Sequence, residues 1–594
     1  FKKLKKFSKS DVPIGEEHLD SFRQFYQKLY ADEHPSMDQM TKAALLDEAL
    51  ALSDQATPNE TLNEPFSIEE LNSSIQQLKN GKASSFDRIP NEILKALNHK
   101  MRSLLLQLFN QCLRTGIYLW SDSVITPIHK KGSITNPDNY RAIAVCSCIG
   151  KLLSTMLLNR LIIHRDSSCP DPPNQAGFKK GSQCNDHILT LLTIMEKYKK
   201  TKNKVYAVFI DLRKAFDLVC RQALLFKLAC YGVNGGFFDI IKSMYRSSTG
   251  HIKMNGKISE AFQILKGTEQ GHPLSPELFK IYFQKLSQLL NEAMTDCPTL
   301  AGLRITHLAW ADDLVVLSLD PSSIQKQLDI IQQYCRDWGL EINISKTKYM
   351  IMNGKDSCGD SWRPTLDGQI IEKVTSYCYL GVIISSNGKC NKAVESLYRK
   401  GLGAYFSLRS TIDRRFIKAK CSLKLFASLV EPILTYGCQT WLPTLPIISK
   451  LVSRFNYDGS IDLSSVAKMP MEQVQLRHLK YTLGISRRSS NSTAWGETGT
   501  TPLFFNCIKL CIKYLNRVMA LPSSSFVKAA LTEQIQLGLT WYKNMQSILE
   551  CFGEVTPNQY QVNSSSSLNA ARLFQLSPEP VSYTHLRAHE TRED

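Results

Sequence analysis

Two apolar runs along the chain each end at aspartates. The first is VFIDLRKAFD, from Val208 to Asp217, and the second is LAWADDLVVLS, from Leu308 to Ser318. An apolar run that stops at carboxylates is typical of a buried strand that carries charge to its exposed end. The pattern therefore predicts an antiparallel sheet backed by helices, with strands over Val205–Leu212, Ile305–Ala311 and Leu314–Leu319.

Most of the remaining chain has helical patterning. Residues 1–63 are polar and helix-prone, and helical spacing predicts a packing stripe made of Phe22, Phe25, Tyr26, Leu29 and Tyr30. Ser67 and Glu70 have the spacing of a capping box at the start of the next helix. From there to about Lys200 helices alternate with basic loops, and after Lys389 the pattern is again largely helical.

The acidic strand ends indicate a cation site. Carboxylates gathered within a few ångströms repel one another, and one of them would take up a proton unless a counter-charge arrived. Mg²⁺ prefers oxygen ligands and is often held by one or two carboxylates with substrate phosphates. Two such ions can clamp the attacking and leaving oxygens of a phosphoryl displacement, so Asp211, Asp312 and Asp313 favour nucleotidyl transfer. The alternative is that Asp312 and Asp313 only form a polar hairpin turn.

A third segment, GTEQGHPLSP from Gly267 to Pro276, lies between the two acidic runs. In this order the three segments resemble the reverse transcriptases, specifically those of non-LTR (LINE-like) retrotransposons. The resemblance implies that Asp211 binds metal, with the Leu212 carbonyl nearby, and that Asp312 and Asp313 complete the metal site. It also implies that Gln270 and Gly271 contact the template and the incoming nucleotide.

Further blocks extend the resemblance over about Phe66 to Pro502. They are LKNGKASSFDRIP, PIHKKG, NYRAI, QAGFKKGSQCNDHI, LEINISKTK, YLGV and EPILTYGCQTW. The implied fold class is α+β, a right-hand polymerase with fingers, a palm that holds an antiparallel sheet, and a helical thumb. The implied regions are an N-terminal helical linker (1–63), fingers (64–200), a catalytic palm (201–389, within a whole domain of about 120–385), a thumb with a LINE-type C-terminal region (390–520), a helical or disordered tail (521–580) and a non-native artefact tail (581–594).

The resemblance also assigns roles around the nucleotide. Arg141, with Lys130 or Lys131, corresponds to basic residues that grip the triphosphate, by bidentate guanidinium contacts or as point charges. Phe216 corresponds to a steric gate against the ribose 2′-hydroxyl, which implies a preference for dNTPs, and the alternative is a core phenylalanine. Lys346 is the candidate general acid for pyrophosphate departure, and the alternative is a surface lysine.

Several positions depart from the family pattern. Trp310 stands where the family usually has Phe or Tyr, and Glu269 adds negative charge next to the nucleotide pocket. Ser85, Phe86 and Arg88 replace Gly, Pro and Gly around Asp87, which removes backbone freedom at a turn. A decaying transposon copy would accumulate such substitutions.

Charge and composition fit a nucleic-acid enzyme. The chain has 72 Lys and Arg against 54 Asp and Glu, a net charge of +18, which suits binding to phosphates. No apolar stretch of about 18 residues predicts a membrane span. The cysteines are scattered without a Cys-x-x-Cys pair, which indicates reduced, mostly buried thiols rather than disulfides or zinc. We therefore expect an intracellular enzyme, in the nucleus, the cytoplasm or both, as part of a ribonucleoprotein.

The sequence thus predicts an RNA-directed DNA polymerase that adds dNTPs to a primer 3′-hydroxyl with two Mg²⁺ ions. Its partners would be an RNA template, a DNA primer or target, and dNTPs, with no membrane. One alternative is a group II intron maturase-like or retron-like polymerase. Another is an inactive retrotransposon fragment that only binds nucleic acid. The template, target site, oligomeric state, processivity and a missing N-terminal endonuclease stay open.

Overall fold

The structure is a computed structural model, and it describes residues 16–33, 37–130, 132–168, 170–294, 296–354, 362–413, 416–451 and 462–551. Lys131, the end of the predicted tail over 521–580 and the whole predicted artefact tail lie outside these described residues. Helices and sheets both contribute substantially, so the predicted α+β class is confirmed.

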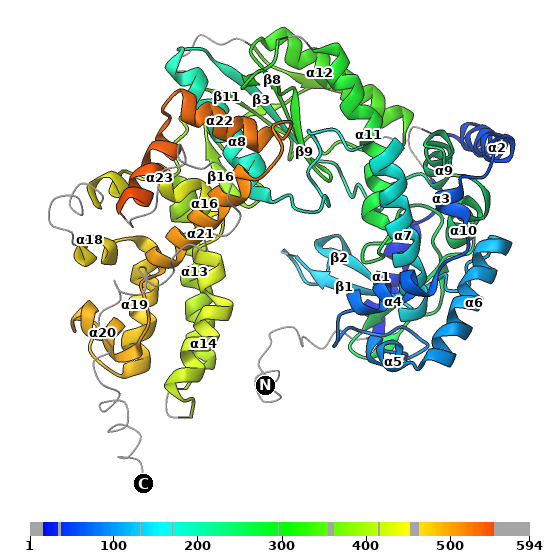
Figure 1. Cartoon of the computed structure of the whole chain (residues 1–594), viewed down its shortest axis with the longest axis horizontal. Coiled ribbons are helices and arrows are strands. Elements are labelled where there is room, and N and C mark those ends of the chain that lie inside the picture. The colour runs from blue at the N-terminus through cyan, green and yellow to red at the C-terminus, as the bar shows by residue number, and fades with distance from the viewer. Residues whose placement is uncertain are drawn as a thin grey trace.

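A five-stranded sheet, called here the central sheet, occupies the middle of the molecule (Figure 1). Its order is β14-β11-β3-β10-β9, and β3 runs antiparallel to both β10 and β11. The predicted antiparallel strands are therefore confirmed. The bounds are β3 (Val205–Ile210), β9 (His307–Trp310), β10 (Asp313–Ser318), β11 (Lys348–Met352) and β14 (Glu372–Lys373).

Strand β3 separates two hydrophobic cores. Val205, Ala207 and Phe209 belong to one core, and the alternate residues Tyr206, Val208 and Ile210 belong to the other. All six are at most 8% exposed, because side chains of a strand point alternately to its two faces and both faces are covered. Burying each large apolar side chain contributes about 1.5–3 kcal/mol, so the position of β3 is strongly fixed.

Different helices cover the two faces of the central sheet. The face of Val208 packs on α11 (Ser275–Ala293) and α12 (Pro321–Asp337). The face of Phe209 packs on α8 (Cys184–Lys200). Short hairpins flank the sheet: β7 (Thr299–Leu300) with β8 (Leu303–Arg304), β12 (Thr365–Leu366) with β13 (Gln369–Ile370), and β15 (Ser376–Tyr379) with β16 (Val382–Ser385).

A second sheet, called here the N-terminal sheet, was not expected between residues 64 and 200. Its strands are β1 (Asp122–His129), β2 (Tyr140–Cys146), β4 (Thr249–Met254), β5 (Lys257–Ile258) and β6 (Phe262–Gln263). Strand β1 pairs antiparallel with β2 and parallel with β4. Since β4 lies more than a hundred residues downstream, the basic loops around β1 did not reveal the pairing that makes it a strand.

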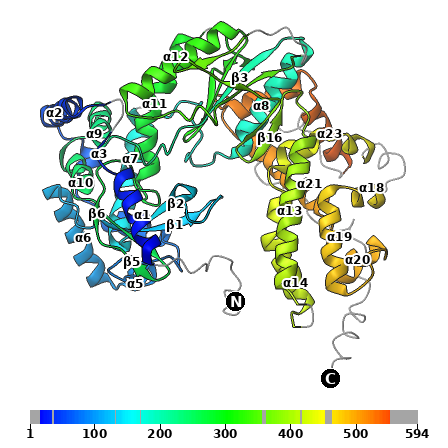
Figure 2. The same cartoon turned by 180° about the vertical axis from the view of Figure 1, so that it is seen from behind.

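The first helix, α1 (Glu16–Leu29), packs on this N-terminal sheet (Figure 2). Phe22, Tyr26 and Tyr30 are buried against Ile125 and Ile252, so the predicted packing stripe is confirmed. Helices cover the other side of the region: α2 (Gln39–Gln55), α3 (Glu60–Asn63), α4 (Ile68–Gln77), α5 (Asn91–Ala96), α6 (His99–Thr115), α7 (Cys148–Ser168), α9 (Arg221–Cys230) and α10 (Gly235–Arg246), with the 3₁₀ turn η2 at Pro137–Asn139.

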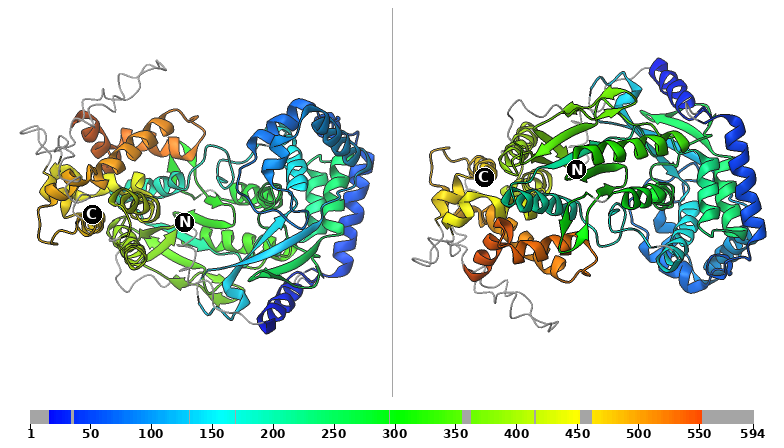
Figure 3. Two further views of the ribbon diagram at one scale, coloured as in Figure 1. Left: turned by 90° about the horizontal axis from the view of Figure 1, so that it is seen from below. Right: turned by 90° about the horizontal axis from the view of Figure 1, so that it is seen from above.

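The chain after Lys389 is helical in its described residues, as predicted, and it lies at the opposite end of the central sheet (Figure 3). Its last helices return to pack against α8. The elements are α13 (Asn391–Thr411), α14 (Ala419–Leu429), α15 (Glu431–Leu434), α16 (Cys438–Trp441), η3 (Leu442–Thr444), α18 (Leu463–Ala467), α19 (Pro470–Leu483), α20 (Asn491–Thr498), α21 (Leu503–Met519), α22 (Phe526–Gln536) and α23 (Thr540–Cys551).

Two smaller sequence predictions concern thiols and membranes. Cys507 and Cys511 lie on one face of α21 as buried free thiols, together with Cys438 of α16. Within the residues that the structure describes, no helix combines the length and apolar character needed to cross a bilayer.

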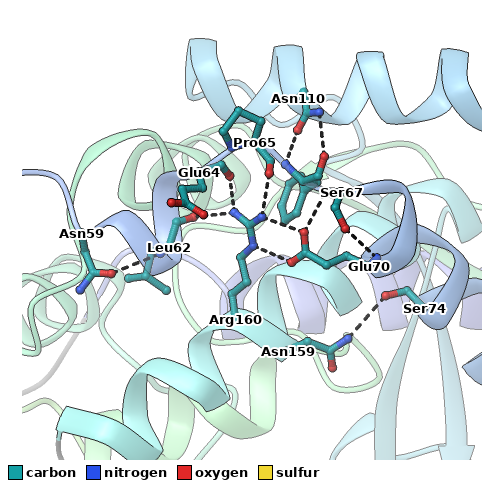
Figure 4. Close-up of polar contacts among 11 residues, drawn as sticks. Asn59, Leu62, Glu64, Pro65, Ser67, Glu70, Ser74, Asn110, Asn159 and Arg160 are labelled. Atoms are coloured by element: carbon teal, nitrogen blue, oxygen red, sulfur yellow. Dashed lines mark hydrogen bonds and ion pairs between the residues drawn. The ribbon is translucent and has the colours of Figure 1, made fainter.

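Arg160 of α7 joins the N-terminal helices to the body of the molecule (Figure 4). Its guanidinium makes two hydrogen bonds of 2.8 Å to the Glu70 carboxylate and donates to the carbonyls of Leu62, Glu64 and Pro65. Glu70 completes the predicted capping box with Ser67, so the box is confirmed. The planar guanidinium of Arg160 thus donates hydrogen bonds to carbonyls at the end of α3 that have no partner within the helix.

We expect Arg160→Ala to destabilise the N-terminal region by about 3 kcal/mol, because it leaves three carbonyl oxygens without this donor and the Glu70 carboxylate without its counter-charge. The urea midpoint of unfolding measures the effect. Arg399→Ala is the matched control, since Arg399 forms an exposed pair with Glu395 on α13 that is worth less than about 0.5 kcal/mol. Equal midpoints for the two variants would contradict the assignment.

Candidate active site

The predicted site residues line one cavity of about 670 Å³ beside the central sheet. Its walls come from the ends of β3, β9 and β10, from the β1–β2 hairpin and from the start of α11. Every predicted site residue except Lys131, which is not among the described residues, lines this cavity: Lys130, Arg141, Asp211, Leu212, Phe216, Gln270, Gly271, Asp312, Asp313 and Lys346.

The two adjacent aspartates lie at a tight hairpin. Trp310 at the end of β9 pairs with Asp313 at the start of β10, which leaves a two-residue turn of Ala311 and Asp312. Ala311 has a φ of +57°, in the left-handed region that costs an L-residue about 1–2 kcal/mol. The turn therefore delivers both carboxylates to the cavity at the expense of backbone strain in Ala311.

Asp211 leaves the end of β3 beside this hairpin. Its carbonyl accepts a 2.7 Å hydrogen bond from the Asn343 N–H, and its own N–H donates to the Thr347 hydroxyl at 3.3 Å. The ammonium of Lys346 lies 3.5 Å from the Asp211 carboxylate. The segment around residues 341–347 thus holds Asp211 and brings one positive charge to it.

The three carboxylates interact electrostatically. Desolvation by burial raises the pKa of Asp312, and the charge of Asp211 raises it further. The pKa of Asp313 is raised to about 6, first by desolvation and then by the charges of Asp312 and Asp211, although the residue is exposed at the start of β10. The surrounding protein stabilises the ionised Asp312 and Asp313 carboxylates poorly, and a bound cation would stabilise them.

The donor set fits a hard cation that brings part of its own shell. The available ligands are carboxylate oxygens and the Leu212 carbonyl, the kind that Mg²⁺ prefers. Among the described residues, no three His, Cys, Asp or Glu side chains are already gathered around a single point. Mg²⁺ commonly takes only one or two protein carboxylates and completes its shell with water and phosphate, so this arrangement suits an ion that arrives with a nucleotide.

Basic side chains face the carboxylates from the N-terminal sheet. Lys130 and Arg141 lie at the same end of the β1–β2 hairpin, where the Lys130 N–H donates to the Asn139 carbonyl at 2.8 Å. Partial burial and the nearby Arg141 lower the pKa of Lys130. Lys214 also lines the cavity, with its ammonium 2.7 Å from the Asp138 carboxylate. The cavity therefore has an acidic wall and a basic wall.

Gln270 is oriented by groups from two distant parts of the chain. Its Nε2 donates a 3.1 Å hydrogen bond to Asp217, whose other carboxylate oxygen accepts a 2.9 Å bond from the Tyr30 hydroxyl. The Gln270 carbonyl accepts from the Ala144 N–H of β2 at 2.8 Å. Gly271 has a φ of +108°, and a Cβ there would lie 2.8 Å from the Ala144 carbonyl oxygen, so only glycine permits this approach. Gln270 thus connects β2 to the segment after β3 and, through Asp217, to Tyr30 directly after α1.

Phe216 packs against other aromatic residues and also lines the cavity, so the structure does not decide between the steric gate and the core phenylalanine. Its ring stacks on Phe279 of α11 with centroids 4.4 Å apart and meets Phe178 edge-on at 6.1 Å. The side chain is nevertheless only half-buried and lines the cavity. A ring held from behind by Phe279 presents a fixed edge to whatever occupies the cavity.

The positions that depart from the family pattern are accommodated in different ways. Trp310 meets His187 edge-on, with centroids 5.9 Å apart. Arg88 has a φ of +53°, which agrees with the expected loss of backbone freedom at this turn. Glu269 was expected beside the nucleotide pocket, but it does not line the cavity. It is partly buried outside the cavity lining and accepts a 3.1 Å hydrogen bond from the Cys146 thiol.

Several residues of the site escaped the sequence reasoning, among them Asp217, Lys214, Phe178 and Tyr30. Asp217, Lys214 and Phe178 lie within quoted motifs, so their proximity to the predicted ligands was an available signal. Tyr30 gave no such signal. It is 187 residues from Asp217, and its helical spacing indicated only a packing role.

Comparisons with known proteins identify the matched segment. Residues 128–384 match the family model described as reverse transcriptase (RNA-dependent DNA polymerase). The chain is 25% identical over 393 residues to the RNA-directed DNA polymerase from mobile element jockey of Drosophila melanogaster, covering 63% of this chain and 41% of that protein. It is 30% identical over 251 residues to the Pol polyprotein from type-1 retrotransposable element R2 of Popillia japonica, covering 41% and 40%.

A solved structure of apo telomerase from Candida tropicalis, truncated from its C-terminal domain, aligns with a TM-score of 0.32 and 15% identity over 52% of this chain and 62% of that one. The chain spans about two fifths of the length of the curated relatives it matches. The family match contains β3, the β9–β10 hairpin and the Gln270 segment. Residues 128–384 are therefore similar to reverse transcriptases, and the relatives named here are proteins of a mobile element and of a retrotransposable element.

Proposed function

We propose that this protein is an RNA-directed DNA polymerase of a non-LTR retrotransposon, which adds dNTPs to a primer 3′-hydroxyl on an RNA template. The observation that carries the proposal is the single cavity with Asp211, Asp312 and Asp313 on one wall and Lys130 and Arg141 on the other. An acidic wall suits metal ions and a basic wall suits a triphosphate, and nucleotidyl transfer needs both.

The acidic wall is proposed to hold two Mg²⁺ ions. Asp211 and Asp312 would be the principal ligands, with Asp313 and the Leu212 carbonyl beside them. When bound, two such ions neutralise charge on the attacking and leaving oxygens of an in-line displacement. The raised pKa values of Asp312 and Asp313 support this proposal. Burial and neighbouring carboxylates disfavour their ionised forms, and a cation would stabilise those forms.

The chain's other residues would bind and orient the substrates. Lys130 and Arg141 would contact the triphosphate, and Lys346 would supply the proton that the departing pyrophosphate takes up. Phe216 would lie under the ribose, and the Gln270 amide, held by Asp217, would face the template or the base. Catalysis in such a site comes mainly from positioning and charge stabilisation rather than from covalent chemistry by the protein.

The regions around the cavity suggest how nucleic acid would bind. We propose that the N-terminal region acts as fingers, the central sheet and its helices as palm, and the helices after Lys389 as thumb. The formal charge of +18 supports contact with an RNA template and a DNA primer through their phosphates. An intracellular ribonucleoprotein, nuclear or cytoplasmic, is part of the same proposal.

A primer-extension assay with an RNA template, dNTPs and Mg²⁺ tests the central proposal. Asp312→Asn should lower extension by about 1,000-fold or more, because it removes a charged ligand from the metal site. Asp329→Asn, on the exposed face of α12, is the matched control and should leave extension unchanged. Extension by the Asp312 variant at the control rate would overturn the assignment. Salt-sensitive RNA binding by the unaltered protein without any extension would instead favour the inactive fragment.

Replacing Phe216 should relax sugar discrimination. In Phe216→Ala the ring edge beside the ribose is removed, so rNTP incorporation relative to dNTP incorporation should rise by about tenfold or more. The measurement is kcat/KM for dGTP and for GTP on the same template. Phe216→Tyr keeps the ring and should keep the discrimination. An unchanged ratio in Phe216→Ala would mean that Phe216 is only a core residue.

Asp217 gives a pH dependence of stability. Burial raises its pKa from 3.8 to about 6, so the ionised form is disfavoured in the folded state. A rise of that size corresponds to about 3 kcal/mol of stability, present below pH 4 and lost as the pH rises to about 6. The stability of Asp217→Asn relative to the unaltered protein should therefore increase by about that amount between pH 4 and 6 and stay constant above.

Urea midpoints measured across this pH range test the Asp217 prediction. Asp320→Asn is the control, because helix-capping hydrogen bonds lower the pKa of Asp320 and its contribution should not change between pH 4 and 6. A difference between Asp217→Asn and the unaltered protein that does not vary with pH would show that Asp217 is ionised at little cost.

A further inference from the structure

The segment 174–177 adds an extra strand-like edge to the central sheet, next to the catalytic hairpin. The Ala309 N–H of β9 donates to the Asn174 carbonyl at 2.8 Å, and the Ala176 N–H donates to the Ala309 carbonyl at 3.0 Å. Gln175 and Ala309 form an isolated parallel bridge. Gln175 therefore lies opposite Ala309, which is two residues before Ala311 in the turn that carries Asp312.

One carboxamide binds both backbone polar groups of the strained residue in that turn. Oε1 of Gln175 accepts hydrogen bonds from the Ala311 N–H at 3.0 Å and the Gly177 N–H at 2.8 Å, and Nε2 donates to the Ala311 carbonyl at 3.3 Å. Gln175 is only 6% exposed, so these bonds form away from bulk water.

The close approach of the segment depends on Gly177. A Cβ at this position would lie 2.2 Å from the Ala311 nitrogen, a distance that no side chain can occupy. The contact is therefore built into the backbone of both segments. Its target is the one residue of the turn whose backbone is strained, with a φ of +57°.

The turn has two reasons to relax without this contact. Ala311 would leave the left-handed region, and like-charge repulsion would move Asp312 and Asp313 away from Asp211 on the same cavity wall. A change in φ at Ala311 rotates the chain directly before Asp312. A small rotation there displaces a carboxylate that must meet an ion and a nucleotide in one geometry.

We propose that Gln175 is a positioning residue for nucleotidyl transfer: its carboxamide clamps Ala311 and so holds the Asp312–Asp313 pair in the geometry that binds metal. The proposal rests on the function proposed above. Gln175 does not line the cavity, so it acts through the hairpin and not through contact with substrate.

Gln175→Met tests the clamp, because methionine keeps the length and volume of glutamine but makes none of the three hydrogen bonds. The kcat for primer extension should fall by about 100-fold while the KM for dNTP changes by less than about threefold, since substrate contacts remain. The divalent-ion concentration that gives half-maximal activity should rise in the same variant.

Ala311→Gly is the rescuing change. Glycine adopts a positive φ without steric cost, so the turn can keep its shape without the clamp. In the Gln175→Met background, Ala311→Gly should raise kcat by about tenfold or more, with little change in melting temperature because the relaxed turn no longer holds a strained alanine. In the unaltered protein the same change should leave kcat unchanged and raise the melting temperature, because the clamp holds Ala311 at a positive φ that glycine adopts without strain.

Gln327→Ala is the matched control for loss of a buried amide. Gln327 is fully buried and donates to the carbonyls of Thr306 and Leu317 in the same sheet, but it does not touch the turn. Gln327→Ala should lower the melting temperature while kcat stays within about threefold, and Ala311→Gly should change its kcat and melting temperature only as much as in the unaltered protein.

The outcomes separate this proposal from the proposed function. An unchanged kcat in Gln175→Met, or a double variant as impaired as the single one, overturns the positioning role. Absence of extension by the unaltered protein overturns the polymerase proposal instead. The melting-temperature coupling between positions 175 and 311 then still decides whether the clamp exists, because it needs no activity.

Discussion

The repulsion among the carboxylates of Asp211, Asp312 and Asp313 is the constraint on which the rest of this structure depends. The charge of Asp211 raises the pKa of Asp312, and the charges of Asp312 and Asp211 raise the pKa of Asp313, so rigid supports are needed to keep these carboxylates on one wall of the cavity before a cation binds. Strand β3 supplies the first support, since its two faces are fixed in two separate cores. The hairpin of β9 and β10 supplies the second. The site is therefore preorganised by apolar packing remote from the charges themselves.

The opposite wall of the cavity is fixed by polar contacts rather than by a shared core. Gln270 receives the Ala144 N–H from the N-terminal sheet and donates to Asp217, which in turn holds Tyr30 of the first helical region. Lys214 similarly reaches Asp138 across the cavity rim. These bonds link elements that carry the basic side chains to the elements that carry the acidic ones. Relative placement of the two walls thus depends on a few directional interactions.

The sequence revealed features that are local in the chain. Apolar runs ending at Asp211 and at Asp312 predicted the strands, and Ser67 with Glu70 predicted a helix start, because each signal fits within one element. The Tyr30–Asp217 bond, the β1–β4 pairing and the contact of Gln175 with Ala311 join segments separated by more than a hundred residues. No spacing rule links such positions. Glu269 is the opposite case. It directly precedes Gln270 in the chain and was expected beside the nucleotide pocket, but its side chain accepts a hydrogen bond from Cys146 and does not line the cavity.

The packing of α1 has a consequence for what counts as the smallest working unit. The match to the family model begins at residue 128, yet Phe22, Tyr26 and Tyr30 cover the N-terminal sheet, and the Tyr30 hydroxyl donates to Asp217. A polypeptide limited to the matched residues would lack these aromatic side chains. The apolar surface of β4 that they cover would then be exposed, and the Asp217 carboxylate would be hydrated. The folded unit that contains the cavity therefore begins with α1, about a hundred residues before the start of the family match.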